Sequence, residues 1–133
     1  MKSSLPIIVR STEIDVNGHV NNAKYLEYFE WGREEWYELC GLPYEAFASM
    51  NIQTVTVNIN VNYRSECRQG DQLTVTCQPE RIGNSSYVLK QEIKDERGEV
   101  RADALVTSVT MDQSTRKSRA VPDELRKFFK SQE

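Results

Sequence analysis

Histidine is scarce in this sequence and the cysteines lack metal-binding spacing, which together narrow the chemistry that the chain can carry out. His19 is the only histidine, so sites built on two histidine ligands, such as HExxH zinc centres, are excluded. The three cysteines, Cys40, Cys67 and Cys77, show no CxxC spacing. We therefore expect buried free thiols in a reducing compartment, and neither a metal site nor a disulfide framework.

Long apolar runs are also missing. No stretch approaches the roughly 20 residues that a membrane-spanning helix needs, and near the N-terminus Arg10 follows only a short apolar segment. We expect a soluble, cytoplasmic protein without membrane insertion. The formal net charge of -3 gives no electrostatic reason to expect a nucleic acid as partner.

The remaining composition is that of an ordinary globular protein. With 133 residues, 38% of them hydrophobic and 28% charged, the chain can bury one core. No repeat, linker or low-complexity segment interrupts it. The sequence therefore predicts a single domain over residues 1–133.

One long helix is predicted over residues 22–40. Asn21 or Asn22 can cap its first turn, and Gly41 followed by Pro43 ends it. Gly32 inside the helix costs about 1 kcal/mol relative to alanine, which a close approach to a sheet would offset. The apolar stripe repeats at intervals of three and four residues and consists of Tyr25, Phe29, Gly32, Trp36 and Leu39, widened by Leu26 and Cys40.

Five segments have the character of strands. Residues 55–63 alternate strictly between apolar and polar, as in a half-buried strand. The others are expected at residues 7–12, 73–77, 87–93 and 104–111, with a short amphipathic helix at 122–130. Short turns between consecutive strands favour an antiparallel sheet. One sheet against one main helix is an α+β architecture.

The segment from Ile14 to Asn22 is the strongest candidate for a functional site. Asp15 precedes a turn containing Gly18, and this turn leads directly into the predicted helix. A carboxylate there could activate water or attack a carbonyl carbon, and the first helical amides could stabilise an oxyanion. Asp15 could equally be a turn or capping residue, which is the commoner role of aspartate before a helix. Spacing alone leaves both interpretations open, and a hydrogen-bonded turn residue is the ordinary interpretation of His19.

The run from Asp15 to Glu30, DVNGHVNNAKYLEYFE, continued by Arg33 and Glu34, resembles the signature of the 4-hydroxybenzoyl-CoA thioesterase-like family. It is especially similar to the bacterial acyl-CoA thioesterase branch, which has a Gly/Gln-His-Val-Asn-Asn-Ala-Arg/Lys-Tyr-Leu run. The order of strand, long helix, four strands also matches the family. The resemblance implies a hotdog fold, in which a five-stranded antiparallel sheet wraps around one long central helix and a short helix follows at the C-terminus.

The resemblance also implies an activity and roles for individual residues. It implies hydrolysis of an acyl-CoA, in this branch a fatty one, with Asp15 as general base or nucleophile. The amide at about Asn22 would polarise the thioester carbonyl, and no metal or organic cofactor would be needed. The resemblance further implies a homodimer, or a dimer of dimers, with sites between subunits. The pocket would be shaped or lined by Gly18, His19, Asn21 and Tyr25.

Two other functions stay open at this point. The run His-Val-Asn-Asn is also similar to plant acyl-ACP thioesterases, whose catalytic groups are assigned differently, so the substrate could be carried by acyl carrier protein. A non-catalytic module that binds acyl-CoA is the third hypothesis. The phosphates of CoA need cations at the pocket mouth. The candidates are Arg64, Arg68, Arg81 and Lys90, and for each of them an ordinary solvated charge is the commoner interpretation.

Overall fold

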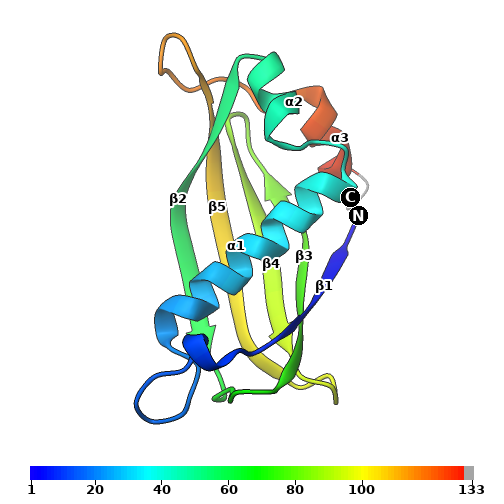
Figure 1. The fold of residues 1–133 in the computed structure, drawn as a ribbon. Helices are drawn as coiled ribbons and strands as arrows, with labels where there is room; N and C mark the ends of the chain where they lie inside the picture. Colours follow the sequence, from blue (N-terminus) through cyan, green and yellow to red (C-terminus); the bar gives the residue numbers. More distant parts are fainter. Residues whose placement is uncertain (131–133) are drawn as a thin grey trace.

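The computed structural model describes residues 1–130, which form one antiparallel sheet, one long helix and several short ones (Figure 1). The sheet has five strands in the order β1-β3-β4-β5-β2, so β1 and β2 are its edges. Within residues 1–130 no helix is both long enough and apolar enough to cross a membrane. The elements are β1 (Ser3–Ile8), η1 (Ser11–Glu13), α1 (Asn22–Leu39), α2 (Tyr44–Ser49), β2 (Ile52–Tyr63), β3 (Gln72–Ile82), β4 (Ser86–Lys94), β5 (Val100–Asp112) and α3 (Asp123–Lys130).

The long helix α1 lies across one face of the sheet (Figure 1). It starts after the predicted cap, Asn21. The Asn21 side chain accepts a hydrogen bond from the Ala23 amide at 2.8 Å, which satisfies one of the unpaired amides of the first turn. Tyr25, Phe29, Gly32 and Trp36 are buried against the sheet as their spacing predicted, together with Tyr28. The predicted apolar stripe was wrong at Leu26 and Leu39, which are 39% and 50% exposed and not buried.

Gly32 allows α1 to lie close to the sheet, as predicted. A Cβ at this position would lie 2.6 Å from Val75 Cγ1 and 2.9 Å from Gln91 Nε2. The close neighbours are therefore side chains of β3 and β4. Gln91 is fully buried and donates to the Phe29 carbonyl at 2.8 Å, so it contacts the helix directly beside the glycine.

The edge strand β2 leaves apolar side chains uncovered. Val57 is 54%, Ile59 37% and Tyr63 48% exposed, although their alternation predicted a half-buried strand. The pairing with β5 shifts between Thr56 and Asn58, so Val57 is the extra residue of a bulge. A bulge interrupts the alternation of faces along a strand. Among residues 1–130, no strand pairs with the outer edge of β2.

The sequence misplaced the first strand and missed α2. The first strand was expected at residues 7–12, but β1 ends at Ile8 and the short helix η1 follows. Pro6 lies within β1, where it is tolerated because the strand is at the edge of the sheet. The short helix α2 follows Pro43 and buries only Phe47, which gives it no recognisable periodicity.

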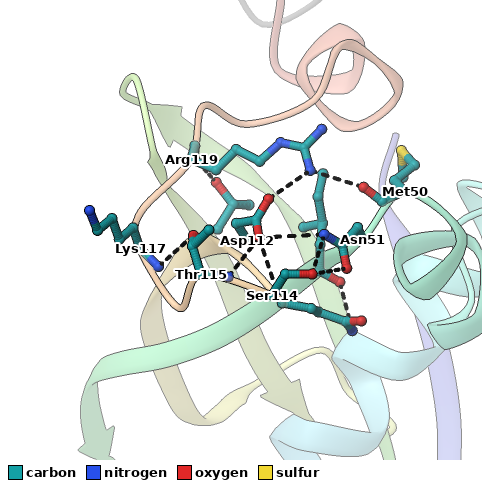
Figure 2. Close-up of polar contacts among 10 residues, drawn as sticks. Met50, Asn51, Asp112, Ser114, Thr115, Lys117 and Arg119 are labelled. Atoms are coloured by element: carbon teal, nitrogen blue, oxygen red, sulfur yellow. Dashed lines mark hydrogen bonds and ion pairs between the residues drawn. The ribbon is translucent and has the colours of Figure 1, made fainter.

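A polar network joins the turn after β5 to the turn before β2 (Figure 2). The Asp112 carboxylate accepts hydrogen bonds from the amides of Ser114 and Thr115, both at 2.9 Å. Arg119 donates to the Met50 carbonyl at 2.9 Å and lies 3.8 Å from Asp112 Oδ2. Asn51, at a φ of 58°, donates to Ser114 Oγ at 3.0 Å. This network holds the end of the sheet next to α2.

Candidate active site

The segment between η1 and α1 forms a closed loop with Asp15 inside it. The two arms of the loop pair at Ile14 and Val20, and the Asp15 amide donates to the His19 carbonyl at 2.8 Å. Gly18 has a φ of +78° and donates to the Asp15 carbonyl at 3.0 Å. Glycine adopts this left-handed conformation without steric cost, which allows the tight return of the chain.

The Asp15 carboxylate is held by its own loop. Its Oδ1 atom accepts hydrogen bonds from the Asn17 amide at 2.9 Å and from the His19 amide at 3.4 Å. Asp15 is therefore a turn residue, as the ordinary interpretation predicted. In the part of the chain that the structure describes, no donor within hydrogen-bond distance reaches Oδ2, so this oxygen is available to water or a substrate. The structural and the catalytic roles are compatible.

The first turn of α1 leaves the Asn22 amide without a hydrogen-bond acceptor among the described residues. The Ala23 amide donates to the Asn21 side chain, and the Lys24 amide donates to the Asn21 carbonyl at 2.8 Å. The Asn22 amide opens the helix, where it has no intrahelical acceptor. It lies at the positive end of the helix dipole, which favours developing negative charge.

Asp15 and Asn22 line the same hollow, which has a volume of about 280 Å³. His19, Val20 and Tyr25 line it as well. Of the predicted site residues, Gly18 and Asn21 are not among the lining residues; they shape the loop and cap the helix. The predicted cluster is thus brought together around one opening.

His19 and Tyr25 also contact the segment of residues 66–68. His19 Nε2 lies 3.4 Å from Glu66 Oε2, and its backbone pairs with Arg68. The Tyr25 hydroxyl accepts a hydrogen bond from the buried Cys67 amide at 3.2 Å, and burial raises the pKa of this hydroxyl. Tyr25 is therefore a neutral residue that the Cys67 amide helps to orient.

The wall opposite the loop was not predicted. It is formed by the end of β2 and the residues that follow it, namely Tyr63, Arg64, Ser65 and Glu66. The Tyr63 ring meets Tyr25 edge to face at 5.3 Å between centroids. Tyr63 is the last apolar residue of the alternating run, but only the fold brings this position against the start of α1.

The four candidate cations are not gathered at the hollow. Arg64 lines it and is paired with Asp103. Arg68 lies next to it and is paired with Glu66 at 2.9 Å. Lys90 shares with Arg64 a separate hollow of about 330 Å³, and Arg81 is exposed near the other end of β3. Among residues 1–130 no group of three or more His, Cys, Asp or Glu side chains is arranged to hold a metal ion.

Comparisons with known proteins identify the family. Residues 9–129 match the model of the thioesterase-like superfamily. The long-chain acyl-CoA thioesterase FadM of Escherichia coli strain K12 is 42% identical over 121 residues, which cover 90% of this chain and 91% of that protein. The crystal structure of the probable thioesterase YbaW from Escherichia coli is 40% identical over 93% of both chains, with a TM-score of 0.81.

A more distant structure shares the fold. A Staphylococcus aureus protein solved in complex with CoA superposes with a TM-score of 0.89 at 23% identity, over 98% of this chain and 85% of that one. The five-stranded antiparallel sheet with α1 across it confirms the predicted hotdog fold, with two short helices, η1 and α2, that were not expected. By its sequence match and its fold, the chain belongs to the thioesterase-like superfamily.

Proposed function

We propose that this chain hydrolyses the thioester bond of an acyl-CoA, with Asp15 as general base or nucleophile and the Asn22 amide as oxyanion donor. One observation carries the proposal: Asp15, which has one carboxylate oxygen without a hydrogen-bond donor, and Asn22, which opens α1, both line the same hollow. The 42% identity to an acyl-CoA thioesterase supports the substrate class.

We also propose that residues 1–133 form a single domain. This stays a prediction, since residues 131–133 lie outside the described part.

The chemistry needs only these two groups. As general base, Asp15 Oδ2 takes a proton from water while the water oxygen attacks the carbonyl carbon. As nucleophile, the carboxylate attacks the carbon itself, and water then hydrolyses the resulting anhydride. In both routes the Asn22 amide stabilises the oxyanion, the carbon–sulfur bond breaks and its electron pair leaves on sulfur. CoA departs as a thiolate that then takes up a proton, so neither a metal nor an organic cofactor is needed.

The acyl group that we propose is fatty, because the relative of known activity is named for long-chain acyl-CoA. A panel of acyl-CoAs of increasing chain length, with aryl-CoA and acyl-ACP beside them, tests this choice through the release of free thiol. A cytoplasmic location is in keeping with the free thiols of Cys40, Cys67 and Cys77.

The decisive variant for the site is Asp15→Asn. Asparagine keeps an oxygen that can accept from the amides of Asn17 and His19, so the loop is retained while the base is lost. We expect kcat/KM to fall at least about a hundredfold. Asp71→Asn is the matched control, because Asp71 also accepts a backbone amide, that of Arg68 at 2.8 Å, outside the hollow. Full activity of Asp15→Asn would exclude the proposed role.

We also propose a homodimer, or a dimer of dimers, built on the free edge of β2. Two copies related by a two-fold axis would pair their β2 strands antiparallel and cover Val57 and Ile59. Val57→Lys would place a charge in this interface and should yield monomers in light scattering. Ile8→Lys is the matched control, since Ile8 is equally exposed at 54% but lies on the opposite edge strand. Dimers that survive Val57→Lys unchanged would contradict the β2 interface.

A further inference from the structure

We propose that Glu13 and Tyr28 are positioning residues. The hydrogen bond between them keeps the Asp15 carboxylate and the Asn22 amide in a fixed position relative to each other. The inference rests on the proposed function, and neither residue was singled out by the sequence for this role. Tyr28 is fully buried on α1, and its hydroxyl donates to Glu13 Oε1 at 2.9 Å.

Glu13 is hydrogen-bonded to the segments on both sides of the loop that carries Asp15. Its backbone carbonyl accepts from the Asn21 amide at 3.0 Å, on the arm that leads into α1. Its carboxylate accepts from the Arg10 amide at 2.8 Å, on the strand side of the loop. Ile14, the next residue, pairs with Val20. Glu13 therefore closes the loop at its base.

The hydrogen bonds of Glu13 link the Asp15 carboxylate to the Asn22 amide. Asp15 lies two residues after Glu13, and Asn22 directly follows the residue whose amide Glu13 binds. A movement of Glu13 would displace the carboxylate and the oxyanion amide relative to each other. Catalysis depends steeply on such geometry, and small displacements cost large factors in rate.

Tyr28 anchors Glu13 to a part of the protein that cannot move easily. Its ring packs between Tyr25 and Trp31, at centroid distances of 6.3 and 5.4 Å. Burial and the bond to Glu13 raise the pKa of the hydroxyl, which stays protonated as the donor. The bond thus ties the loop to the core of α1. Tyr28 and Glu13 are not among the residues that line the hollow, so they act through the loop and not on the substrate.

The test compares Tyr28→Phe, Glu13→Ala and Glu13→Gln in steady-state hydrolysis of acyl-CoA. Loss of the hydrogen bond between Tyr28 and Glu13 should lower kcat about tenfold in Tyr28→Phe, with KM within about twofold. Glu13→Ala also removes the acceptor of the Arg10 amide, so its kcat should fall at least as much. Glu13→Gln keeps an acceptor oxygen and should restore most of kcat. The double variant Tyr28→Phe/Glu13→Ala should lose no more than the worse single variant, because both remove the same bond.

Tyr87→Phe is the matched control. Tyr87 is also fully buried, and its hydroxyl bonds to that of Tyr37, but it lies on β4 away from the hollow. Its loss should lower the melting temperature without changing kcat. Unchanged kcat in Tyr28→Phe, an equal fall in Tyr87→Phe, or fully multiplicative losses in the double variant would overturn the inference.

Hydrogen exchange supplies a readout that does not depend on turnover. The amides of Asn17 and His19, which bond to Asp15, should exchange faster in Tyr28→Phe and at the unchanged rate in Tyr87→Phe. Equal rates in the two variants would overturn the positioning role even if the wild type proved inactive on acyl-CoA. A wild type that hydrolyses no acyl-CoA but shows the faster exchange in Tyr28→Phe would instead contradict the proposed function alone.

Discussion

Replacing Gly32 by alanine tests how closely α1 lies on the sheet. The added Cβ would lie 2.6 Å from Val75 Cγ1, which is about 1 Å closer than a favourable carbon–carbon contact. Val75 is fully buried and β-branched, so its side chain has few alternative rotamers. The second neighbour, Gln91 Nε2 at 2.9 Å, is held by its hydrogen bond to Phe29.

Two opposing effects decide the magnitude. Alanine should stabilise the helix by about 1 kcal/mol through its higher propensity. Overpacking a rigid core costs about 1–3 kcal/mol. The net change should therefore lie between zero and about 2 kcal/mol of lost stability, and we expect about 1 kcal/mol because neither Val75 nor Gln91 can move aside freely. Urea denaturation followed by circular dichroism measures this difference.

A second variant, Val75→Ala, should relieve the steric clash that Gly32→Ala creates. By itself it removes buried methyl groups and should destabilise the fold, but in the Gly32→Ala background it makes room for the new Cβ. The double-mutant cycle should show a favourable coupling of at least about 1 kcal/mol. A Gly32→Ala protein more stable than wild type, or a coupling near zero, would refute the close packing of α1 on β3.

Two further predictions concern ionisable groups. The amides of Thr115 and Ser114 lower the pKa of the Asp112 carboxyl below its usual 3.8, so the stability it adds should be present above that pH and disappear as the pH falls below it. The free energy of unfolding should therefore fall less between pH 7 and pH 3 in Asp112→Asn than in wild type. An equal fall in both proteins would contradict this. Burial raises the pKa of the Cys40 thiol to about 11, so iodoacetamide should alkylate it slowly at pH 8 and faster only toward pH 11. Rapid alkylation of Cys40 in the native protein at pH 8 would contradict that burial.

Much of the fold followed from local patterns in the sequence. The spacing of Tyr25, Phe29 and Trp36 predicted α1 because a buried helical face repeats every three to four residues. The alternation over residues 55–63 predicted β2 but not its exposure, since the bulge at Val57 and the position at the edge of the sheet depend on pairing with β5. The short helix α2 lacks enough turns for any periodicity to show.

The site was predictable where it is continuous in the sequence. Asp15, His19, Asn22 and Tyr25 lie on one short segment, and the structure places all four at one hollow. The opposite wall begins at Tyr63, about forty residues further along, and reaches the hollow only because β2 ends beside the start of α1. The bond between Glu13 and Tyr28 likewise depends on how the loop folds back onto the helix.

The structure of Asp15→Asn with a bound acyl-CoA tests the central claim most directly. The variant should bind the substrate without hydrolysing it, so the position of the thioester can be measured. The account predicts the carbonyl oxygen within about 3 Å of the Asn22 amide nitrogen and the carbonyl carbon facing the side chain of residue 15. A thioester bound instead in the larger groove beside Ile8 and Trp31, away from this loop, would contradict it.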